Sequence, residues 1–147
     1  MMLKYGMAIA FLLAAASPAL ADQCGDAPLA PAMPSVSDIG KQAPAAAAAS
    51  KHNAFLDIKN WQGSLKGYRD CLNAEKAKDQ AAVASAQQSG DKDAQSKIDK
   101  LQQDMQADDT AYNQSVTTET QIVNEFVAMS NAYCSRTDVD KASCPKK

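Results

Sequence analysis

Hydrophobic residues recur every three or four positions along two long stretches of the chain. The first stretch contains the series Ile58, Trp61, Leu65, Tyr68 and Leu72. The second continues with Ile98, Leu101, Met105, Tyr112, Ile122, Phe126, Met129 and Tyr133. This spacing places apolar side chains on one face of an α-helix. The pattern therefore predicts two long amphipathic helices between residues 44 and 134.

Local signals mark where these helices begin and end. Pro44 suits the first position of a helix, where its missing N–H costs nothing. Gly90 suits a helix C-cap with left-handed backbone angles, and Asp91 and Asp93 favour the start of the next helix. We therefore expect a turn at residues 89–92.

Three prolines, Pro28, Pro31 and Pro34, interrupt residues 22–43. Proline fixes φ and removes a backbone donor, so an extended arm is expected over this range. Residues 135–147 form a short polar tail after the second helix.

The two helices are expected to pair as an antiparallel hairpin. With the turn between residues 90 and 91, Phe55 faces Phe126 and Tyr68 lies beside Tyr112, so apolar positions meet. Charge agrees, because residues 51–89 carry six bases and four acids whereas residues 101–133 carry five acids and no base. The fold class is then all-α: a long, coiled-coil-like helical hairpin with a proline-rich arm folded back onto it. At 1.5 Å per residue each helix spans about 60 Å. Near the turn, small residues replace large ones. The seam is expected to continue there through Ala74, Ala77, Ala81 and Ala84.

The first 21 residues have the three parts of a secretory signal peptide. Lys4 supplies the positive charge, Met7–Ala16 is an unbroken apolar run, and Ala19-Leu20-Ala21 is a small-x-small cleavage site. The run is too short to span a bilayer, which takes about 20 residues. Cleavage after Ala21 predicts a periplasmic or secreted chain with no stable membrane insertion. The rival interpretation, a lipoprotein, is disfavoured because Cys24 follows Gln23 rather than a small residue.

An even number of cysteines in an exported chain predicts disulfides. Four cysteines allow three pairings, and the expected hairpin distinguishes them. Cys134 lies level with residue 47, about 36 Å along the axis from Cys71, so these two cannot meet. Cys144 is barely within reach of Cys71, whereas the arm brings Cys24 there easily. We predict Cys24–Cys71 and Cys134–Cys144.

Gly63 and Gly67 precede Cys71 on one stripe of the first helix. Each interior glycine costs a helix about 1 kcal/mol relative to alanine. The arm packing its backbone closely over this stripe would explain them, and glycine on a solvated face is the alternative.

Catalytic and binding chemistry has little support. His52 is the single histidine, and its likeliest partner nucleophile, cysteine, is expected to be in disulfides. No C-x-x-C pair, calcium loop or glycine-rich phosphate loop is present, and a net charge of −2 is unlike a nucleic-acid binder. We therefore predict no enzyme activity, no cofactor and no metal.

Polar residues interrupt the second apolar series. Asp108, Ser115 and Glu119 fall at seam positions, where a polar group costs stability unless it is paired or wet. They indicate a hydrated stretch of the seam, a device that fixes the register of the two helices, or a place where a partner docks. Arg69 or Lys66 on the first helix is within reach of one of these acids and could neutralise it. The possible interaction residues on the seam are Trp61, Tyr68, Asp108, Tyr112 and Glu119.

The arm "DQCGDAPLAPAMP", the helix segment "YRDCL" and the later "NEFVAMSNAYC" resemble small exported helical proteins of Gram-negative bacteria. That resemblance brings no activity, cofactor or partner, and it suits a bridge from the arm to Cys71. Periplasmic stress chaperones also form hairpins, but their LTxxQ repeats are absent. We therefore expect a non-enzymatic structural or interaction protein that binds a protein partner or itself. The alternative is a holdase chaperone or a protein that contacts lipid or apolar ligands.

Overall fold

The computed structural model describes residues 23–145, and the predicted signal peptide lies outside them. Its elements are α1 (Val36–Lys41), α2 (Pro44–Ser89) and α3 (Ala94–Ser135). No strand occurs within these residues, so the predicted all-α class is confirmed. None of the helices described there combines the length and apolar character that a membrane crossing requires.

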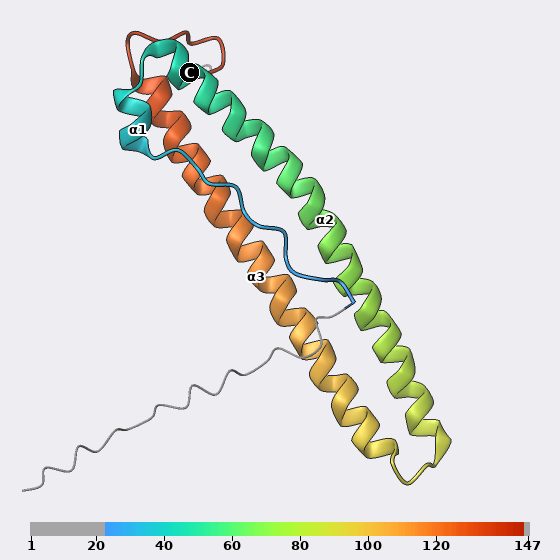
Figure 1. Cartoon of the computed structure of the whole chain (residues 1–147). Coiled ribbons are helices and arrows are strands. Elements are labelled where there is room, and N and C mark those ends of the chain that lie inside the picture. Colours follow the sequence, from blue (N-terminus) through green and yellow to red (C-terminus); the bar gives the residue numbers. More distant parts are fainter. Residues whose placement is uncertain (1–22, 146–147) are drawn as a thin grey trace, which may run out of the picture.

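α2 and α3 lie side by side and run in opposite directions, so the molecule is a long rod (Figure 1). Their 46 and 42 residues correspond to roughly 60–70 Å each. α2 ends at Gly90, whose φ of 66° is a left-handed conformation that glycine adopts without strain. α3 begins after Asp93, so the connection between the two helices is short.

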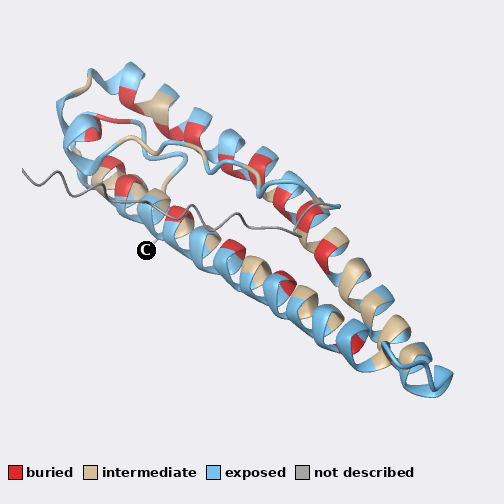
Figure 2. Cartoon of the chain, turned by 60° about the horizontal axis from the view of Figure 1, so that its bottom comes forward, coloured by how far each residue is buried: buried red, intermediate tan, exposed pale blue. Residues whose placement is uncertain are grey.

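The contact between the long helices is a narrow stripe on each (Figure 2). The phenyl rings of Phe55 and Phe126 have centroids 6.2 Å apart, as the expected register requires. α3 is buried at every seventh residue through Asp108, Ser115, Ile122 and Met129. α2 is buried at alternating intervals of four and three, through Ala47, Lys51, Ala54, Ile58, Trp61, Leu65, Tyr68 and Leu72.

The N-terminal arm runs along the pair of long helices and forms a third layer (Figure 1). Cys24 is bonded to Cys71, with 5.7 Å between their Cα atoms. Met33 and Cys24 pack against the apolar cluster that contains Trp61. The Trp61 indole Nε1 donates a hydrogen bond to the Pro28 carbonyl oxygen at 3.0 Å. The arm therefore covers a side of the seam that two helices alone would leave open.

Both predicted disulfides are present, since Cys134 is bonded to Cys144. The two pairs are separated by 47 and 10 residues. Loop-closure entropy in the unfolded chain assigns them roughly 4 and 3 kcal/mol of stabilisation.

One part of the predicted arm is not extended. Residues Val36–Lys41 form α1, so the arm prediction for residues 22–43 is wrong there. Ser35 and Asp38 form a capping box, in which the Ser35 hydroxyl accepts from the Asp38 N–H and the Asp38 carboxylate accepts from the Ser35 N–H. The box satisfies two N-terminal donors at once, and no proline lies between Pro34 and Pro44 to interrupt the helix. α1 places the fully buried Ile39 into the core.

The tail after α3 folds over the open end of the rod, where α2 begins. Val139 is buried there in a cluster with Ile39, Met129 and Tyr133. The Arg136 guanidinium donates to the carbonyl oxygens of Ile39 and Gln42 at 2.7 and 2.8 Å. The tail is thus joined to α1 as well as to α3, and it closes the end opposite the turn.

Packing weakens toward the turn. The alanines expected on the seam, Ala74, Ala77, Ala81 and Ala84, are exposed, so that part of the prediction is wrong. The half-buried residues of α2 that continue its four-three spacing beyond Leu72 are Glu75, Asp79, Ala82 and Ala86. α3 contributes the buried Ile98 and the half-buried Leu101 and Met105, so the last quarter of the rod combines small and charged side chains of α2 with larger apolar side chains of α3.

The two glycines of α2 are not contact points for the arm. A Cβ added at Gly63 or Gly67 would meet no atom within 4 Å, and both positions are exposed. Of the two explanations, the solvated face therefore holds, because the arm packs against the cluster that contains Trp61 and Tyr68.

Replacing these glycines is expected to stabilise the protein. Gly63→Ala and Gly67→Ala should each raise the free energy of unfolding by up to about 1 kcal/mol, because alanine loses less backbone entropy and meets open space. Urea or thermal unfolding monitored by circular dichroism measures the change. Gly90→Ala is the matched control and should destabilise, because its φ of 66° is unfavourable for a Cβ. Destabilisation by Gly63→Ala would show that another group occupies that face.

Candidate functional site

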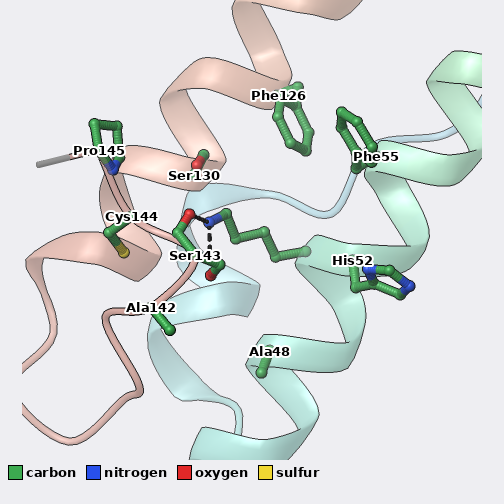
Figure 3. Close-up of a pocket in the computed structure, with 10 residues that line it drawn as sticks. Ala48, His52, Phe55, Phe126, Ser130, Ala142, Ser143, Cys144 and Pro145 are labelled. Carbon is green, nitrogen blue, oxygen red and sulfur yellow. Dashed lines mark hydrogen bonds between the residues drawn. The ribbon is translucent and has the colours of Figure 1, made fainter.

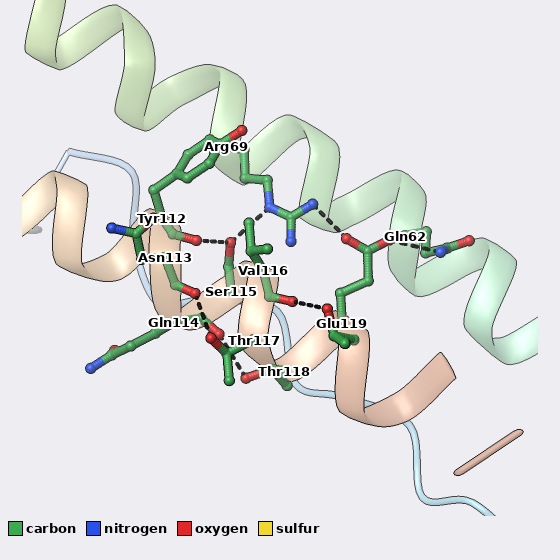
Figure 4. A network of polar contacts seen from close by, with 11 residues as sticks. Gln62, Arg69, Tyr112, Asn113, Gln114, Ser115, Val116, Thr117, Thr118 and Glu119 are labelled. Atoms are coloured by element: carbon green, nitrogen blue, oxygen red, sulfur yellow. Dashed lines mark hydrogen bonds and ion pairs between the residues drawn. The ribbon is translucent and has the colours of Figure 1, made fainter. Parts of the chain in front are cut away.

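Buried polar groups lie between α2 and α3, and the largest set is a network around Arg69 (Figure 4). The Arg69 Nε donates to the Ser115 hydroxyl at 2.7 Å, and its Nη1 donates to Glu119 Oε2 at 2.6 Å. The Gln62 side-chain amide donates to Glu119 Oε1 at 2.7 Å. Ser115 donates in turn to the Tyr112 carbonyl oxygen at 2.6 Å. Two of the three polar seam residues thus share one partner on the opposite helix.

This network is charge-neutral and largely shielded. The side chains of Arg69 and Glu119 are 17% and 26% exposed. The hydrogen bond from Arg69, with a smaller contribution from Gln62, lowers the pKa of Glu119 below its usual value. The guanidinium carbon of Arg69 also lies 5.7 Å from the centre of the Tyr112 ring. Of the two bases expected to reach an acid on α3, Arg69 does so.

Lys66, the other expected partner, does not cross to α3. Its ammonium pairs with Asp70 of its own helix at 2.5 Å, and both side chains are mostly exposed. Such exposed pairs contribute little to stability.

Asp108 lies further toward the turn, and no base of residues 23–145 forms an ion pair with it. Its side chain is buried, and burial raises its pKa, as do the nearby carboxylates of Asp79 and Glu75 on α2 and of Asp104 and Asp109 on α3. Burial also raises the pKa of Tyr68, with Asp108 a further cause. Within residues 23–145 no three acidic, histidine or cysteine side chains converge as metal ligands would. The ionised Asp108 carboxylate therefore destabilises the folded protein locally.

The two aromatic residues proposed as interaction residues on α2 are used inside the molecule. Trp61 and Tyr68 are 6% and 9% exposed and belong to the cluster that the arm covers. Their contacts join α2 to the arm and to α3, which leaves little of either ring for an external ligand.

A second polar site lies at the open end and was missed in the sequence. Lys51 is 8% exposed and belongs to the buried stripe of α2. Its ammonium donates to the carbonyl oxygen of Ser143 at 2.6 Å and to the Ser143 hydroxyl at 3.1 Å (Figure 3). It also lies 5.0 Å from the centre of the Tyr133 ring. Its position in the four-three spacing, between Ala47 and Ala54, is the signal that could have found it.

Lys51 borders a cavity of about 490 Å³. Its walls are mostly apolar and come from α2, α3 and the tail. They are formed by Ala48, Lys51, His52, Phe55, Phe126, Ser130, Ala142, Ser143, Cys144 and Pro145. A cavity of this size that combines apolar walls with a few polar groups is typical of a small-molecule site.

The chain matches no protein-family model, no curated protein and no solved structure.

Neutralising Asp108 is expected to stabilise the protein at neutral pH. The pKa of the Asp108 carboxyl is raised above its ordinary value of 3.8 in the folded protein, so the folded protein binds the carboxyl proton more tightly than the unfolded chain does. The free energy of unfolding therefore falls as pH rises from the unfolded-state pKa to the folded-state pKa. Asp108→Asn should therefore raise the melting temperature at pH 7, and the gain should shrink toward zero below pH 3.8. Thermal unfolding from pH 3 to pH 8 measures this. Asp57→Asn, at an exposed acid of α2, should show no such pH-dependent gain, and a constant effect of Asp108→Asn across the range would contradict the explanation.

Removing one partner of the Arg69 network should cost more than removing both. Glu119→Ala leaves a shielded guanidinium without its carboxylate and is expected to lower the free energy of unfolding by about 1–3 kcal/mol. Replacing the pair by apolar residues, Arg69→Met with Glu119→Leu, should bring stability to within about 1 kcal/mol of the native protein.

Chemical denaturation of the single and double variants measures this difference. Asp70→Ala, which breaks the exposed pair with Lys66, is the control and should change stability by less than about 0.5 kcal/mol. A double variant as unstable as Glu119→Ala would show that the network is not replaceable by packing.

Proposed function

We propose that this protein is an exported, non-enzymatic interaction module whose working part is a coiled-coil-like helical hairpin with a disulfide-anchored arm. Export is supported by the signal sequence and by the state of the cysteines. All four are in disulfides, which persist in oxidising compartments such as the periplasm. A non-enzymatic role is supported by the single histidine and by the absence of a free thiol to act as a nucleophile.

The observation that carries the interaction proposal is apolar exposure on helices that are already paired. Phe55 and Leu56 on α2 are 47% and 44% exposed, and Val116 and Val127 on α3 are 41% and 47% exposed. The arm, α1 and the tail cover other parts of the rod and leave these residues uncovered. These four side chains, two on each long helix, are apolar surface that contact with another chain would remove from water. The partner we propose is another protein chain, a second copy included.

Site-specific photo-cross-linking tests this proposal. A benzophenone side chain at Val127 should capture a discrete partner, or a second copy, when the protein is expressed in the periplasm of a Gram-negative host. The same group at Lys100, an exposed polar position of α3, is the matched control and should capture little. Mass spectrometry identifies the adduct, and light scattering of the purified protein measures self-association. A monomeric protein with no adduct at Val127 would refute the proposal.

The holdase alternative predicts a different result in the same experiment. A chaperone that protects unfolded chains should give a broad smear of adducts at Val127, and the purified protein should suppress aggregation of a model client. The exposed apolar residues support it too, but they are scattered among polar neighbours and do not form a broad surface, which favours the more selective interaction.

A further inference from the structure

We propose that the cavity at the open end of the rod binds an amphipathic monocarboxylate, with Lys51 pairing with the carboxylate and Phe55 and Phe126 holding the apolar part. The site shares Phe55 with the proposed protein interaction, but ligand binding is measured on the purified protein and cross-linking is measured at Val127, so either proposal can fail without the other.

The first observation is the charge of Lys51. Among residues 23–145 no carboxylate lies within ion-pair distance of its ammonium, although Arg69, Lys76 and Arg136 each have one. Burial lowers the pKa of Lys51. A buried charge is normally paired, because removing an ion from water costs several kcal/mol. The acceptors on Ser143 satisfy hydrogen bonds but do not neutralise the charge, so the site favours an anion.

The second observation is the set of polar groups around the ammonium. Ser143 accepts two of its hydrogen bonds, and the Cys134 sulfur lies 3.9 Å away as a much weaker acceptor. Ser130 and Ser143 line the same cavity as Lys51, and both carry a hydroxyl group (Figure 3). A hydroxyl can donate to a carboxylate oxygen as well as accept from an ammonium. Lys51, Ser130 and Ser143 can therefore supply a charge and donors to one carboxylate, and no acid of residues 23–145 lines the cavity.

The third observation is the apolar wall. Phe55 and Phe126 form it together with Ala48 and Pro145. Phe55 is 47% exposed even though its ring lies 6.2 Å from that of Phe126. A ligand with an acyl or aryl group would cover this exposed ring, with a gain of about 25 cal/mol for each Å² of apolar surface removed from water. A carboxylate alone would not use this wall, and a neutral apolar ligand would not use Lys51.

The test uses octanoate, with octan-1-ol and acetate as probes of the apolar and the charged part alone. Titration of the disulfide-intact protein, followed by amide resonances of residues 48–55 and 126–144, should give saturable shifts with octanoate at least tenfold tighter than with either other probe. Octanoate binding no tighter than octan-1-ol, or shifts spread away from the cavity, would overturn the proposal.

Variants assign the two parts of the site. Lys51→Met should weaken octanoate binding at least tenfold, to the level of octan-1-ol, whereas Lys59→Met, at an exposed lysine two turns further along α2, should leave it unchanged. Unaltered octanoate binding by Lys51→Met would refute the assigned role.

A second pair of variants avoids the contacts of Lys51 with the tail, in case Lys51→Met disturbs folding. Phe55→Ala should weaken octanoate and octan-1-ol alike, and Phe55→Glu should abolish octanoate binding by adding a negative charge at the cavity wall. Circular dichroism and intact mass verify that each variant keeps its helices and disulfides. Normal octanoate affinity in Phe55→Glu would place the ligand elsewhere.

Discussion

Two paired helices have one contact surface between them, and this constraint governs the whole structure. A single seam buries too little apolar surface to stabilise a small protein by itself, so such scaffolds rely on additional staples. Here the staple is the arm, held to the middle of α2 by the Cys24–Cys71 bond. The arm converts a two-element seam into a three-layer core, and the Pro28 carbonyl accepts the hydrogen bond of the buried Trp61 indole.

The core changes character along the rod. At the open end, α1 and the tail surround Ile39, Met129 and Tyr133, so the cluster there is closed on several sides. In the middle an apolar cluster around Trp61 and Leu65 lies beside the Arg69–Glu119 pair. Toward the turn α2 contributes small and charged side chains, and α3 contributes Ile98 and Leu101. Local stability follows buried contact, so opening motions should be easiest near Gly90 and hardest beside α1.

The apolar periodicity was enough to predict the long elements, because the four-three spacing that places side chains on one face is the same spacing that buries them. The disulfide pairing was predictable for a related reason. The fixed rise of a helix sets the axial distance between Cys71 and Cys134, and only the pairing Cys24–Cys71 with Cys134–Cys144 brings all four cysteines easily within bonding distance. α1 was missed because the prolines before it outweighed the Ser35–Asp38 capping box, which is a short and local signal.

The candidate sites were predicted less completely than the fold. Asp108, Ser115 and Glu119 stood out because polar residues broke an apolar series, and Arg69 was a partner within reach. Two explanations of Gly63 and Gly67 stayed open because their spacing defines a stripe on α2 but does not say whether the arm covers it. Lys51 was missed because its partners come from a tail whose path depends on Val139 and Arg136, both outside any periodic pattern.

The two disulfides share a topological property. One closes a loop within residues 24–71 and the other within residues 134–144, so both ends of each bond lie on the same side of the turn. No covalent bond besides the backbone at Gly90–Asp93 therefore joins α2 to α3. A single cut there would yield two separately cross-linked pieces held together by the seam alone. For the same reason two intact chains can exchange α3 by straightening that connection, without reducing either bond, which makes a swapped dimer accessible to a fully oxidised protein.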